Sequence, residues 1–250
     1  MRLYKAIRDL FQNYRYIMPT FLTGTIILYG LSHVLPLIGT LLFLPINIGI
    51  AYVMFTAIAY KNNTQKFHLL YGFKIGSYTV NVIYLFLRQI SYLLPLGIGA
   101  FLFAFFRGVL SDFSIPYSLA ILNLIIFIIP SMILSLMLAM VPYLLADYRF
   151  DQRKRNPLKA SFHIMKGNYI KLLTIRIFFI PWLLLQSSSM VVVFVNYYER
   201  FIGETGIPLT YIPVIYIVLP IILLLFLPWY HMMHAELYVQ NRHKLSSIPK

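Results

Sequence analysis

The side chains best suited to chemistry include two histidines near the C-terminus. His231 and His234 are three residues apart, on one face of a helix, and Glu236 follows them. Two imidazoles at this spacing can bind one metal ion, but there is no His-Glu-x-x-His pattern, and a third ligand would have to come from His163 or Asp147. A helix end in the lipid headgroup layer explains the pair without a metal. We therefore expect no metal site.

Sequence patterns for catalysis are missing. The chain contains no Gly-x-x-x-x-Gly-Lys-Ser/Thr loop, no Gly-x-Ser-x-Gly elbow and no cysteine, so it offers neither a P-loop, nor a hydrolase nucleophile of that type, nor a thiol. No serine, histidine and acid stand at a recognisable spacing. We expect the protein not to be an enzyme and to hold no cofactor.

A few polar side chains interrupt long apolar segments. They are Gln186, Ser187, Ser188, Ser189 and Asn123. Polar groups at membrane depth can line a substrate path, or they can hold helices together by hydrogen bonds. We favour the second interpretation. No acid or base occurs at the centre of an uncharged run, which argues against a proton-coupled carrier.

Composition indicates the kind of secondary structure that holds these residues in place. Of the 250 residues, 60% are hydrophobic and only 11% are charged, whereas soluble domains carry about 25% charged residues. This predicts an all-α, polytopic transmembrane helical bundle that forms a single membrane domain over residues 1–250. The uncharged runs predict six spans, at about residues 17–33, 41–60, 89–107, 116–146, 176–198 and 207–235. We interpret the fourth and sixth as long helices, tilted or kinked at prolines.

Two amphipathic segments accompany the spans. Residues 2–16 place Leu3, Ile7 and Leu10 on one face and basic residues on another, which predicts an interfacial helix on an anionic leaflet. Asn156 and Pro157 form a helix start, followed by a basic cytoplasmic helix at about 157–166 that ends at Gly167.

The charges predict orientation. With the N-terminus inside, all 21 Lys and Arg except Arg107 and Arg200 fall on the cytoplasmic side, as the positive-inside rule requires. We therefore expect a multi-pass protein of the cell membrane with both termini cytoplasmic and no nucleic-acid partner. The candidates for contact with anionic lipid are Arg149, Arg153, Lys154, Arg155 and Lys159.

The second half of the chain carries a series of short motifs. An Ala-Met-Val-Pro-Tyr-Leu-Leu-Ala-Asp run ends at Asp147, and a later Ile-Pro-Trp-Leu-Leu run contains Trp182. Between and after these runs stand Ser161, Met165, Gly167 and Pro228. In order and spacing, mainly over residues 139–240, the chain resembles the bacterial integral membrane family called domain of unknown function 975. The resemblance implies a membrane fold and supplies no activity.

Two roles stay open from the sequence. The first is a non-catalytic partner or protector that acts with another membrane protein or with a membrane-active peptide, and this is the role we favour. The alternative is a transporter or lipid-handling protein with an intramembrane hydrophobic cavity. The absence of central charges disfavours an active transporter, whereas the proline-bent helices and the polar run at 186–189 are compatible with a cavity.

Overall fold

The computed structural model describes residues 8, 11–12, 17–19, 21–24, 36–60, 69–73, 78–109, 117–147, 155–179 and 219–247. Within these ranges the chain is all-helical and has no strand. The elements are α3 (Pro36–Ala59), η1 (Leu69–Phe73), α4 (Tyr78–Val109), α5 (Tyr117–Met137), α6 (Val141–Ala146), α8 (Pro157–Met165), α10 (Leu219–Asn241) and η4 (Arg242–Ser247). A further helical segment covers residues 169–179.

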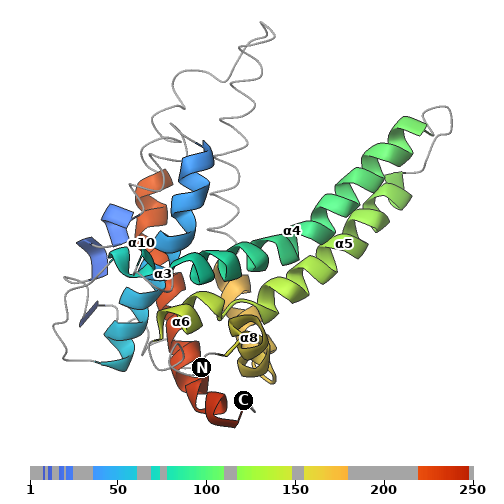
Figure 1. Cartoon of the computed structure of the whole chain (residues 1–250). Coiled ribbons are helices and arrows are strands. Elements are labelled where there is room, and N and C mark those ends of the chain that lie inside the picture. Colours follow the sequence, from blue (N-terminus) through green and yellow to red (C-terminus); the bar gives the residue numbers. More distant parts are fainter. Residues whose placement is uncertain are drawn as a thin grey trace, which may run out of the picture.

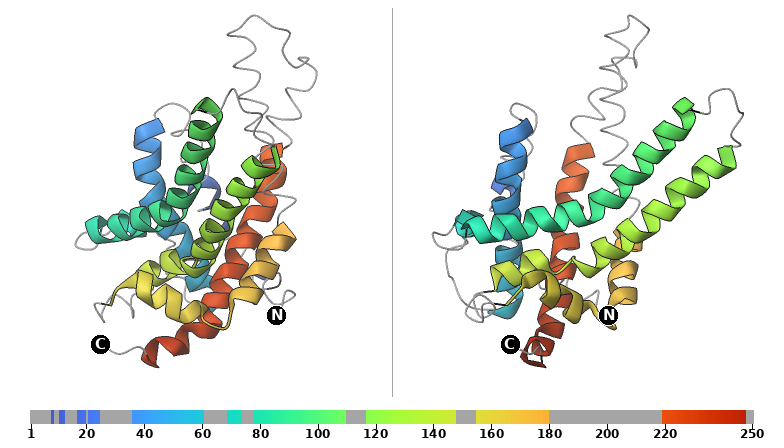
Figure 2. Two further views of the ribbon diagram at one scale, coloured as in Figure 1. Left: turned by 90° about the vertical axis from the view of Figure 1, so that its right-hand side faces the viewer. Right: turned by 45° about the vertical axis from the view of Figure 1, so that its right-hand side comes forward.

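Helices α4 and α5 form an antiparallel hairpin that leans away from α3 and α10 (Figure 1). Helix α4 is bent. Its first turns run across the molecule, whereas its later turns run beside α5 (Figure 2, right). Pro95 lies inside this helix. Gly99 lets the two helices approach closely, since a Cβ atom there would stand 2.7 Å from Cβ of Phe127.

Two stretches are long and apolar enough to cross a membrane, Tyr78–Gly99 and Ile125–Ala146, each of 22 residues. At about 1.5 Å per residue a continuous helix of this length matches the roughly 30 Å of hydrocarbon in a bilayer. The second stretch includes the turn at residues 138–140. Leu44–Ala59 is apolar but shorter. The helices differ from the predicted spans at their ends: α4 begins well before residue 89, and α10 continues past residue 235 to Asn241.

The predicted fourth span is not one continuous helix. Helix α5 ends at Met137, residues 138–140 form a turn, and α6 begins at Val141. The two prolines of this span are Pro130, inside α5, and Pro142, in the first turn of α6, and the break falls between them. The physical reason is a hydrogen-bonding side chain from elsewhere in the chain, described below.

Helix α3 forms the centre of the packed core. It contacts α10, η1 and α6, and Ile48, Met54 and Phe55 on it are almost fully buried. The short helix η1 lies directly against it, with the rings of Tyr52 and Tyr71 stacked at a centroid distance of 4.0 Å. The other buried core residues lie mainly in α6, α8, the 169–179 segment and α10. The core therefore extends to the end of the bundle where α6, α8 and η4 gather (Figure 1), which we call the α6–α8 end.

Candidate functional site

The strongest polar constellation is centred on Asp147, directly after α6. The Asp147 side chain is 1% exposed. Its Oδ2 accepts a hydrogen bond of 2.8 Å from the Tyr238 hydroxyl, and its Oδ1 accepts one of 2.5 Å from Nη2 of Arg242. We call these three residues the Asp147 cluster. Although a basic loop follows Asp147 directly in the sequence, the carboxylate is buried and pairs with residues of the C-terminal helices.

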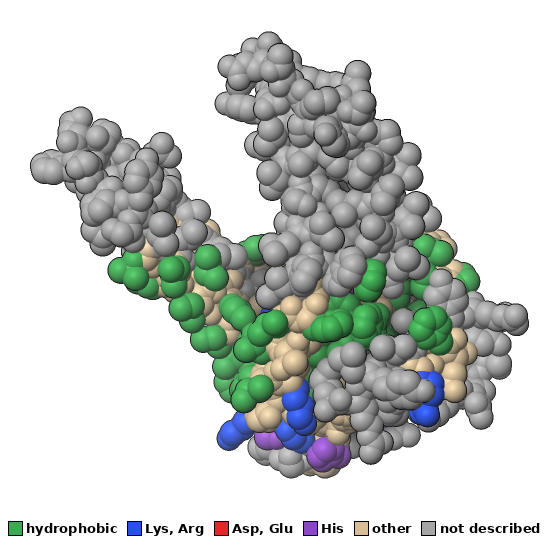
Figure 3. Space-filling view, turned by 180° about the vertical axis from the view of Figure 1, so that it is seen from behind, with side chains coloured by type: hydrophobic (Ala, Val, Ile, Leu, Met, Phe, Trp, Pro, Cys, Tyr) green, Lys and Arg blue, Asp and Glu red, His purple; other side chains and the backbone are tan. Residues whose placement is uncertain are grey.

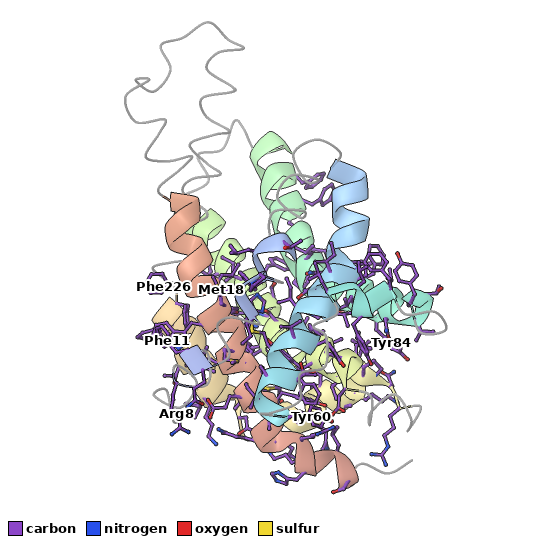
Figure 4. The ribbon with its side chains drawn as sticks, turned by 90° about the vertical axis from the view of Figure 1, so that its left-hand side faces the viewer. Arg8, Phe11, Met18, Tyr60, Tyr84 and Phe226 are labelled. Atoms are coloured by element: carbon purple, nitrogen blue, oxygen red, sulfur yellow. The ribbon has the colours of Figure 1, made fainter. Side chains whose placement is uncertain are left out.

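Aromatic rings enclose the Asp147 cluster. The guanidinium carbon of Arg242 lies 5.1 Å from the ring centre of Phe55, a cation–π contact. The ring of Tyr238 meets Phe55 edge-on at 5.7 Å. Arg242 also hydrogen-bonds Tyr60, which lies just after α3 (labelled in Figure 4). The ion pair is thus held in a low-dielectric surrounding, where breaking it is costly.

The surroundings raise the pKa of two members of the cluster, Tyr238 and Arg242. Burial raises the pKa of the Tyr238 phenol well above its usual range, and the Asp147 carboxylate raises it further. Partial burial lowers the pKa of Arg242, but the Asp147 carboxylate outweighs this and the pKa is raised overall. Tyr238 therefore stays a neutral donor and Arg242 stays charged. The Asp147 cluster thus joins the end of α6 to α10 and η4 by two hydrogen bonds.

Ser161 on α8 closes the break between α5 and α6. Its hydroxyl donates to the carbonyl of Met137 at 2.7 Å and accepts from the amide of Met140 at 3.2 Å. A broken helix leaves backbone groups without their normal partners, and buried backbone groups need such partners. One buried serine serves both sides of the turn, which explains why the chain can break there.

Neighbouring residues explain where α8 begins and ends. The Asn156 side chain accepts from the amides of Leu158 and Lys159, and Pro157 occupies the first turn. After the helix, Gly167 has φ +81°, in the left-handed region that favours glycine. The helix predicted near 157–166 is therefore present, and Met165 points into the core with no exposed surface.

An asparagine pair joins this region to α10. Nδ2 of Asn168 donates to Oδ1 of Asn241 at 2.8 Å and to the carbonyl of Ile164. Nδ2 of Asn241 donates to Leu237 in turn. Both side chains are buried, so the pair fixes the position of α10 beside the end of α8.

Two of the five basic residues predicted to contact lipid can be placed. Arg155 is half-buried, and its Nη1 donates to the carbonyl of Leu245 in η4. Lys159 is exposed. Arg149, Arg153 and Lys154 lie outside the described residues. Arg155 thus helps to hold the C-terminal segment, as does Lys244, whose Nζ donates to the carbonyl of Lys166 at 2.9 Å.

The remaining predicted site residues are placed only in part. Gln186, Ser187, Ser188, Ser189 and Trp182 lie outside the described residues, as do most of the interfacial helix at 2–16 and of the first and fifth spans. Asn123 belongs to α5, but its side chain is not described. Pro228 is buried inside α10.

The histidine pair lies on α10, where this helix contacts Tyr143 of α6. Nδ1 of His234 is 2.8 Å from the carbonyl oxygen of Tyr230. The ring centroids of His234 and Tyr230 lie 4.2 Å apart. The carbonyl of His231 accepts from the Tyr143 hydroxyl. Among the residues that the structure describes, no three His, Cys, Asp or Glu side chains group as metal ligands.

Sequence reasoning missed Tyr238, Arg242, Asn168 and Asn241 as members of a buried network. A signal existed for the first two, because Tyr238 and Arg242 are four residues apart and so share a helix face. This shared face could have been paired with Asp147, the acid at the end of an apolar run. No comparable signal linked the two asparagines.

The described helices and their apolar stretches define an all-helical protein with two candidate membrane-spanning helices. The chain belongs to the family described as "Protein of unknown function (DUF975)", whose model matches residues 11–244. It has no significant match among curated proteins or among solved structures. The matched residues include the Asp147 cluster, Ser161 and the pair of Asn168 and Asn241.

Proposed function

We propose that this protein is a non-catalytic, six-span protein of the cell membrane that acts by lateral contact with another membrane protein or a membrane-active peptide. Both termini are cytoplasmic in this proposal, and the α6–α8 end is the cytoplasmic end. Basic and histidine side chains at the bottom of Figure 3, below the apolar surface, support that orientation. In this proposal, basic residues of the cytoplasmic face also contact anionic lipid.

The internal bonding of the α6–α8 end supports a non-catalytic role. Both Asp147 oxygens are used by Tyr238 and Arg242. Ser161 bonds backbone on both sides of the α5–α6 break. These polar groups bond to one another and to the backbone, as expected for a scaffold that holds spans in register.

The observation that carries the proposal is the α4–α5 hairpin. The described part of this hairpin exposes large apolar side chains along both helices, including Phe101 at 68% and Leu122 at 53%. Its helices pack mainly on each other, and they meet α3, η1, α6 and α8 as well. Two helices that leave the bundle with apolar flanks offer a lateral surface that a second membrane protein or peptide can pack against.

Photo-crosslinking in living cells tests the contact surface. We expect a photo-reactive amino acid at Leu94 or Ile126 to yield one discrete protein or peptide adduct in stable ratio to the chain. The same group at Ile177, which is 54% exposed on the 169–179 segment and falls within the predicted fifth span, is the matched control and should yield lipid adducts alone. Lipid adducts at every position, together with a lipid in a closed intramembrane cavity of the purified protein, would favour the alternative role in lipid handling or transport.

Reporter fusions test the six-span topology. Fusions after Lys61 and Lys154 are expected to report the cytoplasm, and fusions after Asp112 and Glu204 the outside, because positive residues gather in the segments assigned inside. An external signal at Lys154 would contradict the topology, and with it the assignment of the α6–α8 end to the cytoplasm.

A further inference from the structure

The outward face of α8 combines basic and apolar side chains. Lys159, Phe162 and Lys166 recur at steps of three and four residues, so they lie on one face of the helix and its C-terminal end. Both lysines are exposed, and Phe162 is 48% exposed. The opposite face is buried in the core, where Ile164 has no exposed surface. A phenylalanine thus stands between two lysines on the outward face of a packed helix.

The same mixture continues beyond the turn that follows α8. Ile170, at the start of the 169–179 segment, is 80% exposed, a larger fraction than for any other large apolar side chain that the structure describes. Lys171 beside it is also exposed. Farther along the segment, Ile177 and Phe178 are exposed apolar side chains. The segment therefore leads from a mixed basic and apolar surface to an apolar one.

The sequence around these lysines contains no acid. Residues 152–198 include no aspartate or glutamate. Asp147 and Glu236, the acids among the described residues, are both buried. Charge complementarity at the three exposed lysines therefore favours an anionic surface from outside the chain.

The depth of this surface follows from the proposed topology. The fifth span begins at about residue 176 there, so Ile170 is roughly 9 Å outside the hydrocarbon at about 1.5 Å per residue. The headgroup layer covers about 5–8 Å on each side of the hydrocarbon, which is within reach of a side chain at residue 170. In both views of Figure 2, η4 lies lower than α8, at the end of α10. In this topology η4 is therefore farther from the membrane than α8.

A bilayer surface suits both kinds of side chain. Apolar side chains gain by entering the boundary between headgroups and acyl chains, and lysines gain by contact with anionic headgroups. The lysine stems can lie along apolar surface while their charges stay in water. A soluble acidic partner would match the charges, but it would not explain why the surface continues into the exposed apolar side chains of Ile177 and Phe178.

We propose that α8 and the start of the 169–179 segment lie in the headgroup layer of an anionic leaflet. Phe162 and Ile170 reach the acyl boundary, and the lysines contact anionic headgroups. The proposal rests on the topology proposed above and deepens it, because it makes α8 an interfacial helix that holds the α6–α8 end against the membrane. We call this surface the elbow surface; its residues are Lys159, Phe162, Lys166, Ile170 and Lys171.

Depth-dependent quenching in proteoliposomes of the full-length protein tests the elbow surface. The chain has no cysteine, so Phe162→Cys and Ile170→Cys can each carry a polarity-sensitive fluorophore. In vesicles of phosphatidylglycerol and phosphatidylcholine, we expect lipids with a nitroxide near the headgroup to quench both labels several-fold more than a label at Ser246→Cys. Ser246 is the matched control, because it is exposed on η4. A label at Phe178→Cys should instead be quenched most by a nitroxide on the acyl chain.

Neutralisation of two lysines tests the part played by charge. Each lysine close to an anionic leaflet favours contact about fivefold. Lys166→Gln/Lys171→Gln in the Phe162→Cys background should therefore lower lipid quenching in vesicles that contain phosphatidylglycerol. In vesicles of phosphatidylcholine alone, the same substitutions should leave quenching unchanged.

The outcomes of this test are separate from those of the proposed function. Nitroxide lipids occupy both leaflets, so quenching does not depend on the direction in which the chain crosses the bilayer, and purified protein carries no partner. Quenching at Phe162→Cys and Ile170→Cys no stronger than at Ser246→Cys, with equal access of acrylamide from water, would overturn the proposal and favour a soluble acidic partner. Quenching that is equal in the two kinds of vesicle and insensitive to the lysine substitutions would overturn it as well.

Discussion

Asp147→Asn is expected to lower the melting temperature of the purified full-length protein by about 10 °C. The substitution keeps the shape of the side chain but removes the charge that compensates Arg242, whose side chain is only 19% exposed. Removing one partner of a buried ion pair costs about 3 kcal/mol or more, because the other charge stays buried, and in a chain of this size 1 kcal/mol corresponds to a few degrees. Thermal unfolding in detergent, followed by intrinsic fluorescence, measures the change.

A double-mutant cycle distinguishes the ion pair from simple loss of packing. Arg242→Gln alone should destabilise to a similar extent, and the double variant Asp147→Asn/Arg242→Gln should cost clearly less than the sum of the two, because it leaves no uncompensated charge. Lys166→Gln removes a positive charge from an exposed side chain and should stay within about 0.5 kcal/mol of the parent. Strict additivity in the cycle would show that Asp147 and Arg242 do not stabilise each other.

Features determined by neighbouring residues could be predicted from the sequence. The helix at Pro157–Met165 follows from Asn156 as its cap, proline in its first turn and Gly167 after its end, and each of these effects operates within one turn. The all-helical class could be expected from composition and from long uncharged runs, because apolar segments of this length favour helices that satisfy their own backbone.

The Asp147 cluster could not be predicted in the same way. Asp147 and Arg242 are 95 residues apart in the sequence, and Arg242 lies beyond the predicted end of the last span. The basic loop directly after Asp147 offered nearer partners. Only the packing of α10 beside α6 decides which cation reaches the carboxylate, and helical periodicity within one segment carries no information about that packing.

The break in the predicted fourth span has a similar cause. Two prolines marked places where the helix could bend, and the actual turn at 138–140 contains neither of them. Its backbone groups are satisfied by Ser161, which comes from α8. A position that looks like ordinary helix in its own sequence can therefore be broken when a distant side chain supplies the missing bonds.

Gly49→Ala is expected to displace η1 from α3 and to destabilise the protein by about 3 kcal/mol, at the upper end of the cost of overpacking. A Cβ atom at Gly49 would overlap the backbone carbonyl of Leu69, and one at Gly72 would overlap the carbonyl of Pro45. Backbone cannot move aside as a flexible side chain can, so the two elements must separate. The Tyr52–Tyr71 stack would be lost with them.

The measurement combines thermal stability with a direct test of the contact. The chain has no cysteine, so Tyr52→Cys and Tyr71→Cys can be introduced together and joined by a short bifunctional thiol reagent. Cross-linking should be efficient in this background and strongly reduced when Gly49→Ala is added. Gly97→Ala is the matched control, because it makes the same change within α4 at a position where a Cβ meets nothing within 4 Å. The higher helix propensity of alanine should stabilise this variant by up to about 1 kcal/mol. If Gly49→Ala cross-links and melts like Gly97→Ala, then η1 does not lie against α3 as closely as the two glycines require.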